Sequence, residues 1–167
     1  MACAGRGGWQ DVGNIGEATN AKSYEIAYEN ITWETSTIRV WLNTVFCQAA
    51  FTMAEQEQII EPLAVYNSSP NYKLAGVDNT HDRIFLLSID EAQVYFADTD
   101  DRIAFPTAYA IEQGIGIDAN GVGWWWLRSP GYDGDSVALV SDFGGVLDNG
   151  FFYYESAGIR PALWLSP

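Results

Sequence analysis

The sequence has little positive charge. It holds eight Lys and Arg residues against 22 Asp and Glu, which gives a formal net charge of −14 at pH 7 and a pI of about 4.1. A surface this acidic repels the phosphates of nucleic acids and the headgroups of anionic lipids. We therefore expect no nucleic-acid partner and no adsorption to anionic membranes.

Cysteine and long hydrophobic runs are also scarce. The only cysteines are Cys3 and Cys47, and no CxxC or Cys/His cluster occurs, so we expect neither a disulfide framework nor a zinc site. No apolar run reaches the roughly 18 residues that cross a bilayer, and the first residues lack the apolar core of a signal peptide. The sequence predicts no membrane insertion and leaves the cellular location open.

The motifs of common catalytic and cofactor sites are missing. The single histidine, His81, lies in a polar stretch, and no GxSxG nucleophile elbow or phosphate-binding loop is present. Cys47 lies among apolar residues at helical spacing, which is typical of a core cysteine. The acidic residues Asp98, Asp100 and Asp101 lack the glycine and closing glutamate of a calcium loop. These observations favour a non-enzyme without cofactor or metal.

Aromatic residues, by contrast, are abundant. They make up 14% of the 167 residues, with seven Trp, nine Tyr and eight Phe. A chain of this length suits one domain, and so many aromatic rings are not easily all buried in it, so we expect some to be exposed for contact. Residues 1–22 are weakly patterned and are interpreted as a loose lead-in, and residues 23–167 as a single domain.

The first half of the chain has helical patterns. Apolar residues from Ile38 to Phe46 recur at helical spacing and predict a helix that begins at Thr35–Ser36 and ends near Ala50. Thr52 and Glu55 form a capping-box pattern, which predicts a second helix up to about Ile60. Shorter helices are expected after Ser88, through Phe96, and at 107–113, with an acidic loop at 98–101 between them.

The second half has strand patterns. Strands are expected at 124–127, 137–140, 150–154 and 159–165, with a turn at 141–145, and two more short strands in the first half at 23–31 and 83–87. Because helices dominate the first half and strands the second, the pattern favours an α+β fold over alternating α/β.

Segment 132–157 has an unusual composition. It reads YDGDSVALVSDFGGVLDNGFFYYESA and contains no Lys, Arg, Gln, Met, Trp or Pro. Tyr and Phe offer stiff contact area, and Ser, Gly, Asp and Asn supply adaptable polar contacts, which is the composition of a paratope. The alternative is a hairpin with Gly, Asp and Asn turns and buried alternate aromatics. Composition alone leaves both interpretations open.

Two aromatic blocks flank this segment. WWWLRSPG precedes it at 124–131, and GIRPALWL follows it at 158–165. Arg128 and Arg160 are suited to bidentate pairing with carboxylates or carbonyls that would fix the two ends of the segment.

The flanking blocks resemble a family of bacterial and phage domains of unknown function whose sequences carry WWLRSPG and end in GVRPALWL. Residues 32–43, TWETSTIRVWLN, resemble the TWExSxIRxWLN helix of that family, and residues 85–92, FLLSIDEA, resemble its FLLSxxEA segment. The resemblance runs from about Ser23 to the C-terminus, whereas the family's initial strand is not matched. It implies a C-type-lectin-like fold, with two main helices on a small, mostly antiparallel sheet and Trp124–Trp126 in its core.

Members of this type resemble the variable proteins of diversity-generating retroelements, which rewrite adenines in a C-terminal coding stretch, often in Asn codons. Such rewriting cannot give Lys, Gln, Met, Trp or Glu, and segment 132–157 has only one of these, Glu155. The resemblance implies a hypervariable region in a non-catalytic binding protein of bacterial or phage origin, at a cell surface or on a phage particle. Its partner would be a protein ligand or a glycan, with the oligomeric state left open.

The candidate ligand-binding residues are the positions expected to vary and to face solvent. They are Tyr132, Asp133, Asp135, Ser136, Leu139, Ser141, Asp142, Phe143, Leu147, Asp148, Asn149, Phe151, Phe152, Tyr154, Glu155 and Ser156, with Gly134, Gly145 and Ala157 also variable. The fixed positions would be Val137, Ala138, Val140, Gly144, Val146, Gly150 and Tyr153. Aromatic members would anchor a ligand and aspartates would steer a basic partner.

Three other interpretations stay open. One is a glycan-binding lectin-like module, although the Glu-Pro-Asn, Gln-Pro-Asp and Trp-Asn-Asp motifs of calcium-dependent lectins are absent. Another is an enzyme related to formylglycine-generating enzymes, which would need active-site cysteines where only Cys3 and Cys47 exist. The last is an ordinary paralogue with drifted loops.

Overall fold

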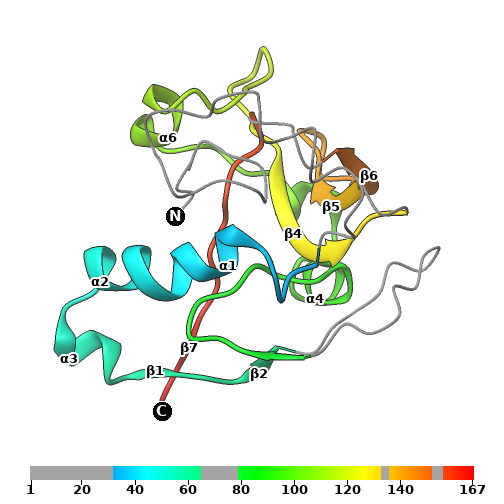
Figure 1. The fold of residues 1–167 in the computed structure, drawn as a ribbon. Coiled ribbons are helices and arrows are strands. Elements are labelled where there is room, and N and C mark those ends of the chain that lie inside the picture. Colours follow the sequence, from blue (N-terminus) through cyan, green and yellow to red (C-terminus); the bar gives the residue numbers. More distant parts are fainter. Residues whose placement is uncertain (1–31, 65–78, 133–135, 152–155) are drawn as a thin grey trace, which may run out of the picture.

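The computed structural model describes residues 32–64, 79–132, 136–151 and 156–167. The predicted first helix is confirmed as one continuous helical run (Figure 1). It consists of α1 (Thr37–Trp41), a π-helical turn η1 (Leu42–Phe46) and α2 (Cys47–Ala50), with the Ser36 side chain as its N-cap. The sequence did not predict the π-helical turn. The lead-in at 1–22 and the strand expected at 23–31 lie outside the described residues.

The second predicted helix is shorter than expected. The capping box of Thr52 and Glu55 is present and begins α3 (Met53–Gln56). Ile59 and Ile60, which we had assigned to its end, instead form β1 (Ile59–Ile60) and pair antiparallel with β7 (Trp164–Leu165). This pairing buries Ile59, so a contact with the distant C-terminus overrides the local helical pattern.

The middle of the chain contains short elements. Strand β2 (Leu63–Ala64) pairs antiparallel with β3 (Thr80–His81). The helices expected after Ser88 and at 107–113 are confirmed as α4 (Ile89–Tyr95), with a capping box, and α6 (Ala108–Glu112). The loop prediction for the acidic stretch 98–101 is wrong, because residues 99–102 form the helical turn α5 (Thr99–Arg102). Its C-terminal Arg102 is buried, so the turn is held by tertiary contacts.

Residues 83–87 are more irregular than predicted. Residues 84–87 are buried as expected, but their sheet pairing is a single antiparallel bridge between Phe85 and Ala162. The segment thus serves mainly to fill the core and to hold the C-terminal chain. That chain, red in Figure 1, runs from the start of β4 past Phe85 to β1.

The largest sheet has three antiparallel strands in the order β4–β5–β6. These are β4 (Trp125–Pro130), β5 (Ser136–Val140) and β6 (Val146–Phe151), joined between β5 and β6 by the predicted turn at 141–145. Every residue of β4 and β5 is buried. A strand buried on both faces forms a rigid frame for the loops at its ends.

One hydrophobic core joins this sheet to the helices. It contains Ile38, Leu42 and Cys47 from the helical run, Ile89 and Ala92 from α4, and most of β4 and β5. The mixed α+β class with small antiparallel sheets is therefore confirmed. The core position of Trp125 and Trp126 is confirmed, but Trp124 is 37% exposed and lies outside the core.

Candidate functional site: a display turn and an adjacent hollow

The residues of the TWETSTIRVWLN block meet at one buried carboxylate. Asp82, which is 1% exposed, accepts hydrogen bonds from Arg39 Nε at 2.6 Å, Trp33 Nε1 at 2.9 Å and Thr80 Oγ1 at 2.5 Å. Asn43 adds a bond from its Nδ2 to the Ile84 carbonyl at 2.8 Å. The block therefore ties the first helix to the segment after β3 and has a structural role.

The FLLSIDEA and WWWLRSPG blocks meet in the same way. Arg128 donates to both carboxylate oxygens of Glu91, with 2.8 Å between Nη2 and Oε1, and also to the Leu86 carbonyl. The predicted bidentate pairing of Arg128 is thus confirmed. Burial opposes ionisation of Glu91, but the hydrogen bonds from Arg128 and Ser88 outweigh it and hold the pKa of Glu91 below its ordinary value.

Arg160 is held differently from the expected ion pair. Its guanidinium lies over the rings of Phe96, at 4.5 Å, and Trp125, at 4.9 Å. Within the described part of the chain, its buried Nη1 has no hydrogen-bond partner. Burial lowers the pKa of Arg160. The predicted bidentate pairing of Arg160 is therefore wrong, and cation–π contacts with the two rings take its place.

The turn between β5 and β6 is fixed to the core. Gly144 has a φ of +75°, and a Cβ there would lie 1.9 Å from the Thr99 carbonyl oxygen, so only glycine fits. Arg102 Nε donates to the Gly144 carbonyl at 2.8 Å, and Ser141 Oγ accepts from the Gly145 amide at 3.1 Å. The Phe143 side chain is nevertheless 63% exposed at the tip. The turn thus holds an exposed aromatic ring in a fixed position. Residues 141–145 are called the display turn below, and residues 132–157 the display segment.

The predicted ligand-binding positions fall into three groups. Exposed positions are Tyr132, Phe143, Asn149 and Ser156, and half-buried ones are Asp142, Leu147 and Asp148. Ser136, Leu139 and Ser141 are at most 1% exposed, so their assignment as surface contacts is wrong. Ser136 and Leu139 belong to the covered central strand β5, and Ser141 closes the turn. The side chain of Phe151, together with Asp133, Asp135, Phe152, Tyr154 and Glu155, lies outside the described residues.

The structure places the accessible positions at two ends of the sheet. The Tyr132 amide donates to the Asp148 carbonyl at 2.7 Å, which brings these residues together where β4 ends. Asp142 and Phe143 lie at the opposite end, beside the start of β4, because Trp125 pairs with Val140. Leu147 and Asn149 lie between these two ends, on the edge strand β6.

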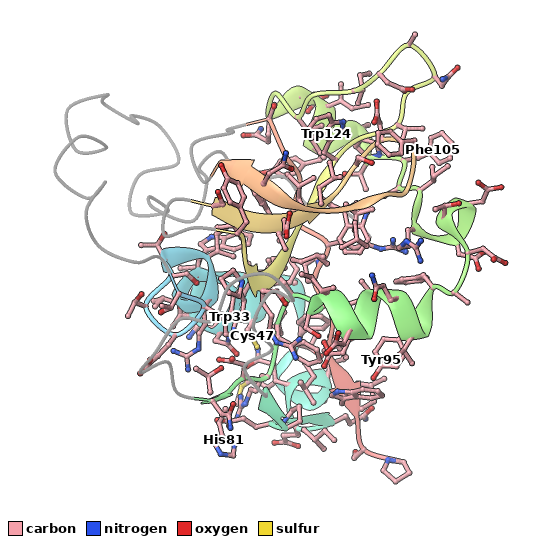
Figure 2. All side chains as sticks on the ribbon, turned by 90° about the vertical axis from the view of Figure 1, so that its right-hand side faces the viewer. Trp33, Cys47, His81, Tyr95, Phe105 and Trp124 are labelled. Carbon is pink, nitrogen blue, oxygen red and sulfur yellow. The ribbon has the colours of Figure 1, made fainter. Side chains whose placement is uncertain are left out.

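A hollow of about 310 Å³ opens beside the display turn. Its lining combines part of segment 132–157 with residues from elsewhere: Gly116, Ile117, Asp118, Trp124, Asp142, Ser156 and Ala157. The Gly116 amide donates to the Ser156 carbonyl at 2.8 Å, and the Gly158 amide donates to the Trp124 carbonyl at 2.7 Å. These bonds join the loop before β4 to the end of the display segment. Figure 2 shows Trp124 at this end of the molecule, close to Phe105.

Sequence reasoning missed the four lining residues that precede the display segment. Trp124 was assigned to the core with its two neighbours, and residues 116–118 were not singled out. The stretch GIGIDANG at 114–121 carried a signal, because Gly, Asp and Asn in this density are typical of a structured turn. The sequence alone does not show that this turn contacts Ser156.

Asp118 organises that turn. Its carboxylate accepts hydrogen bonds from the Val122 amide at 2.7 Å, the Asn120 amide at 2.9 Å and the Asn120 Nδ2 at 2.9 Å. The Val122 bond is the main reason that the pKa of Asp118 lies below its ordinary value. Asp118 thus gives the rim of the hollow a negative charge at neutral pH.

A second, more apolar hollow of about 250 Å³ lies far from the display segment. It is lined by Phe85, Leu87, Tyr95, Phe96, Ala162, Leu163 and Trp164, with a T-shaped contact between Tyr95 and Trp164. Figure 2 shows Tyr95 well separated from Trp124. No residue of this hollow belongs to segment 132–157, which makes it a useful comparison site.

The described residues offer few groups for metal binding or catalysis. In that part of the chain, no three His, Cys, Asp or Glu side chains gather closely enough to hold a metal ion. Cys47 is a free, buried thiol and His81 is exposed. No described helix is both long and apolar enough to span a membrane.

Comparison with known proteins identifies the family of this chain. The model of a family described as "Domain of unknown function (DUF6273)" matches residues 12–167. No curated protein and no solved structure matches the chain.

Proposed function

We propose that this chain, which belongs to the DUF6273 family, is a non-catalytic ligand-binding protein. In this proposal a C-type-lectin-like scaffold displays a variable surface, and the protein is the target of a diversity-generating retroelement. The observation that carries the proposal is Phe143. This ring is 63% exposed at the tip of a turn in which Gly144 accepts a hydrogen bond from Arg102 and lies close to Thr99, next to the fully buried strand β5.

The arrangement of the frame supports the proposal. Charged side chains of the motif blocks form ion pairs within the scaffold, such as Arg128 with Glu91 and Arg39 with Asp82. Val137, Ala138 and Val140, proposed as fixed positions, are fully buried. A scaffold of this kind tolerates changes at exposed positions because surface substitutions usually alter stability by less than about 0.5 kcal/mol.

A pair of matched libraries tests the proposal at the protein level. One library randomises the accessible positions Tyr132, Asp142, Phe143, Asn149 and Ser156, and a control library randomises the buried positions Ser136, Leu139 and Ser141. We expect the first to stay folded and to yield binders to a panel of proteins and glycans. The second should largely unfold, because cavities and overpacking in a core each cost about 1–5 kcal/mol. Equal loss of folding in both libraries would contradict the display function.

The surrounding DNA tests the natural process. We expect a reverse transcriptase gene and a near-identical repeat of the coding stretch for residues 132–157 that differs from it only at adenines. A neighbourhood with neither would reject the diversification hypothesis and leave a fixed binding protein.

A glycan-binding module is the second candidate. The observation that favours it is the exposed Trp124 beside Asp118 and Asp142, since an aromatic face next to carboxylates also suits a sugar ring. Retention on a glycan array that is lost in Trp124→Ala would support it over a protein partner. The enzyme alternative would need Cys3 or Cys47, the latter a buried thiol, so alkylation of both thiols should inactivate such an enzyme and leave a binding protein unchanged.

A further inference from the structure

The hollow beside the display turn has a distinctive chemical lining. Its side chains include two carboxylates, Asp118 and Asp142, the ring of Trp124, and the aliphatic groups of Ile117 and Ala157. None of the described residues that line it is Lys or Arg. Carboxylates only accept hydrogen bonds, so the ligand has to supply donors and, preferably, positive charge.

The two carboxylates have different roles in the described part of the chain. Asp118 is occupied by the amides of its own turn, which fix its position and keep it ionised. Asp142 takes part in none of the ion pairs that involve described residues, and its backbone is held by the fixed turn 141–145. A preformed, unneutralised carboxylate next to an exposed indole is favourable for a cation.

The apolar part of the lining matches the stem of such a ligand. Ile117 is 46% exposed and Trp124 37% exposed. A long aliphatic chain with a charged head buries its methylenes on surfaces like these while the head stays near carboxylates. The volume of about 310 Å³ is at the small end of ligand pockets, which suits one side chain better than a larger group.

We infer that this hollow receives a lysine or arginine side chain of a partner protein, with the cation against Trp124 and Asp142 and the methylenes against Ile117. This inference rests on the proposed binding function and names the kind of partner it would take. The overall charge of −14 would attract such a basic segment over a distance. Because Asp142 is a candidate variable position while Trp124 and Asp118 lie outside the segment, variation there would tune the charge of the hollow without removing its aromatic wall.

Titration with small probes tests the inference on the intact chain. The readout is the indole N–H resonance of Trp124, assigned by its loss in Trp124→Phe. The probes are the Nα-acetyl amides of lysine, arginine and norleucine, the last an uncharged aliphatic comparison, together with methyl mannoside. We expect saturable shifts with the two cationic probes, weakened by added salt, and little response to norleucine or the sugar.

Matched variants assign the effect to the hollow. Asp142→Asn should weaken binding of the cationic probes roughly fivefold, the size expected for one partly exposed charge contact beside an aromatic ring. Glu57→Gln removes the same charge next to α3, at the opposite end of the molecule in Figure 1, and should leave binding unchanged. Equal responses to norleucine and lysine, a response only to the sugar, or equal effects of the two variants would each overturn the inference.

The two proposals can fail separately. If binders selected from the display library keep their affinity in Asp142→Asn and Trp124→Phe, the hollow is not the cation site and the display function stands. If the library yields no binders while lysine and arginine probes still bind at Trp124, the hollow is a cation site in a protein that does not use its turn for display.

Discussion

The motif blocks and segment 132–157 use polar side chains in opposite ways. Arg128 of the WWWLRSPG block pairs with Glu91 of the FLLSIDEA block and with a backbone carbonyl, and Arg39 of the TWETSTIRVWLN block pairs with the buried Asp82. In the turn of the segment, Asp142 is half-buried and Phe143 is exposed, while Arg102 holds the backbone at Gly144. The contrast indicates that the most recognisable motifs of this chain build the scaffold and leave the turn accessible.

The largest expected effect on stability comes from removing the buried ring of Trp125. Trp125 is 1% exposed, donates its indole N–H to the Arg102 carbonyl and lies beneath Arg160. Trp125→Ala should lower the free energy of unfolding by about 3–5 kcal/mol. Thermal or urea unfolding measures this, and a melting temperature equal to that of the parent would contradict the core position of Trp125.

Asp82→Asn should have the next largest effect. It replaces an acceptor of four hydrogen bonds by an amide and leaves the Arg39 guanidinium without its counterion. We expect a loss of roughly 2–3 kcal/mol in urea unfolding. Asp101→Asn, an exposed position, is the control and should change stability little. Equal stability of the two variants would show that the motif block does not depend on this carboxylate.

The lowered pKa of Glu91 predicts that the stability of the fold depends on pH. Because its folded pKa is below the ordinary value, the Arg128 pair stabilises the fold fully above about pH 4.3 and loses that contribution as the pH falls toward the folded pKa. Glu91→Gln should cost about 1–2 kcal/mol at neutral pH and flatten the fall in stability in acid. Parallel pH profiles for the parent and the variant would argue against the pair as the titrating contact.

The smallest stability effect is expected at the display turn. Phe143→Ala removes an exposed ring and should change the free energy of unfolding by less than about 0.5 kcal/mol. The same variant should weaken binding of partners selected on the display surface. Gly144→Ala, one residue away, is the contrasting variant, since its Cβ would collide with the Thr99 carbonyl and should destabilise the fold markedly. Similar unfolding curves for the two variants would contradict the fixed turn.

The elements that depend on contacts between residues close together in the chain could be predicted from the sequence. The capping box at Thr52 and the helix cap at Ser88 satisfy amides within one turn, so a stretch of four residues suffices to recognise each of them. The turn at 141–145 follows from its glycines in the same way. The bidentate pairing of Arg128 was also predicted correctly, whereas the same prediction for Arg160 was wrong, because its guanidinium lies over the rings of Phe96 and Trp125.

The sequence could not predict contacts between distant segments. Ile59 and Ile60 form a strand only because residues 164–165 lie beside them. The three tryptophans of the flanking block gave no indication that Trp124 would be exposed while its neighbours are buried. The hollow was missed for the same reason, since Gly116 and Ser156 are far apart in the chain and meet only in the folded protein.

The burial of β5 limits which codons a diversified segment could contain. Val137, Ala138 and Val140 are fully buried, so substitutions there would disturb the core. Under the proposed diversification, the template copy would need codons that already begin GT or GC at these positions, because such codons keep their amino acid when only adenines are rewritten. Adenine-containing template codons would then be confined to accessible positions such as Phe143 and Asn149.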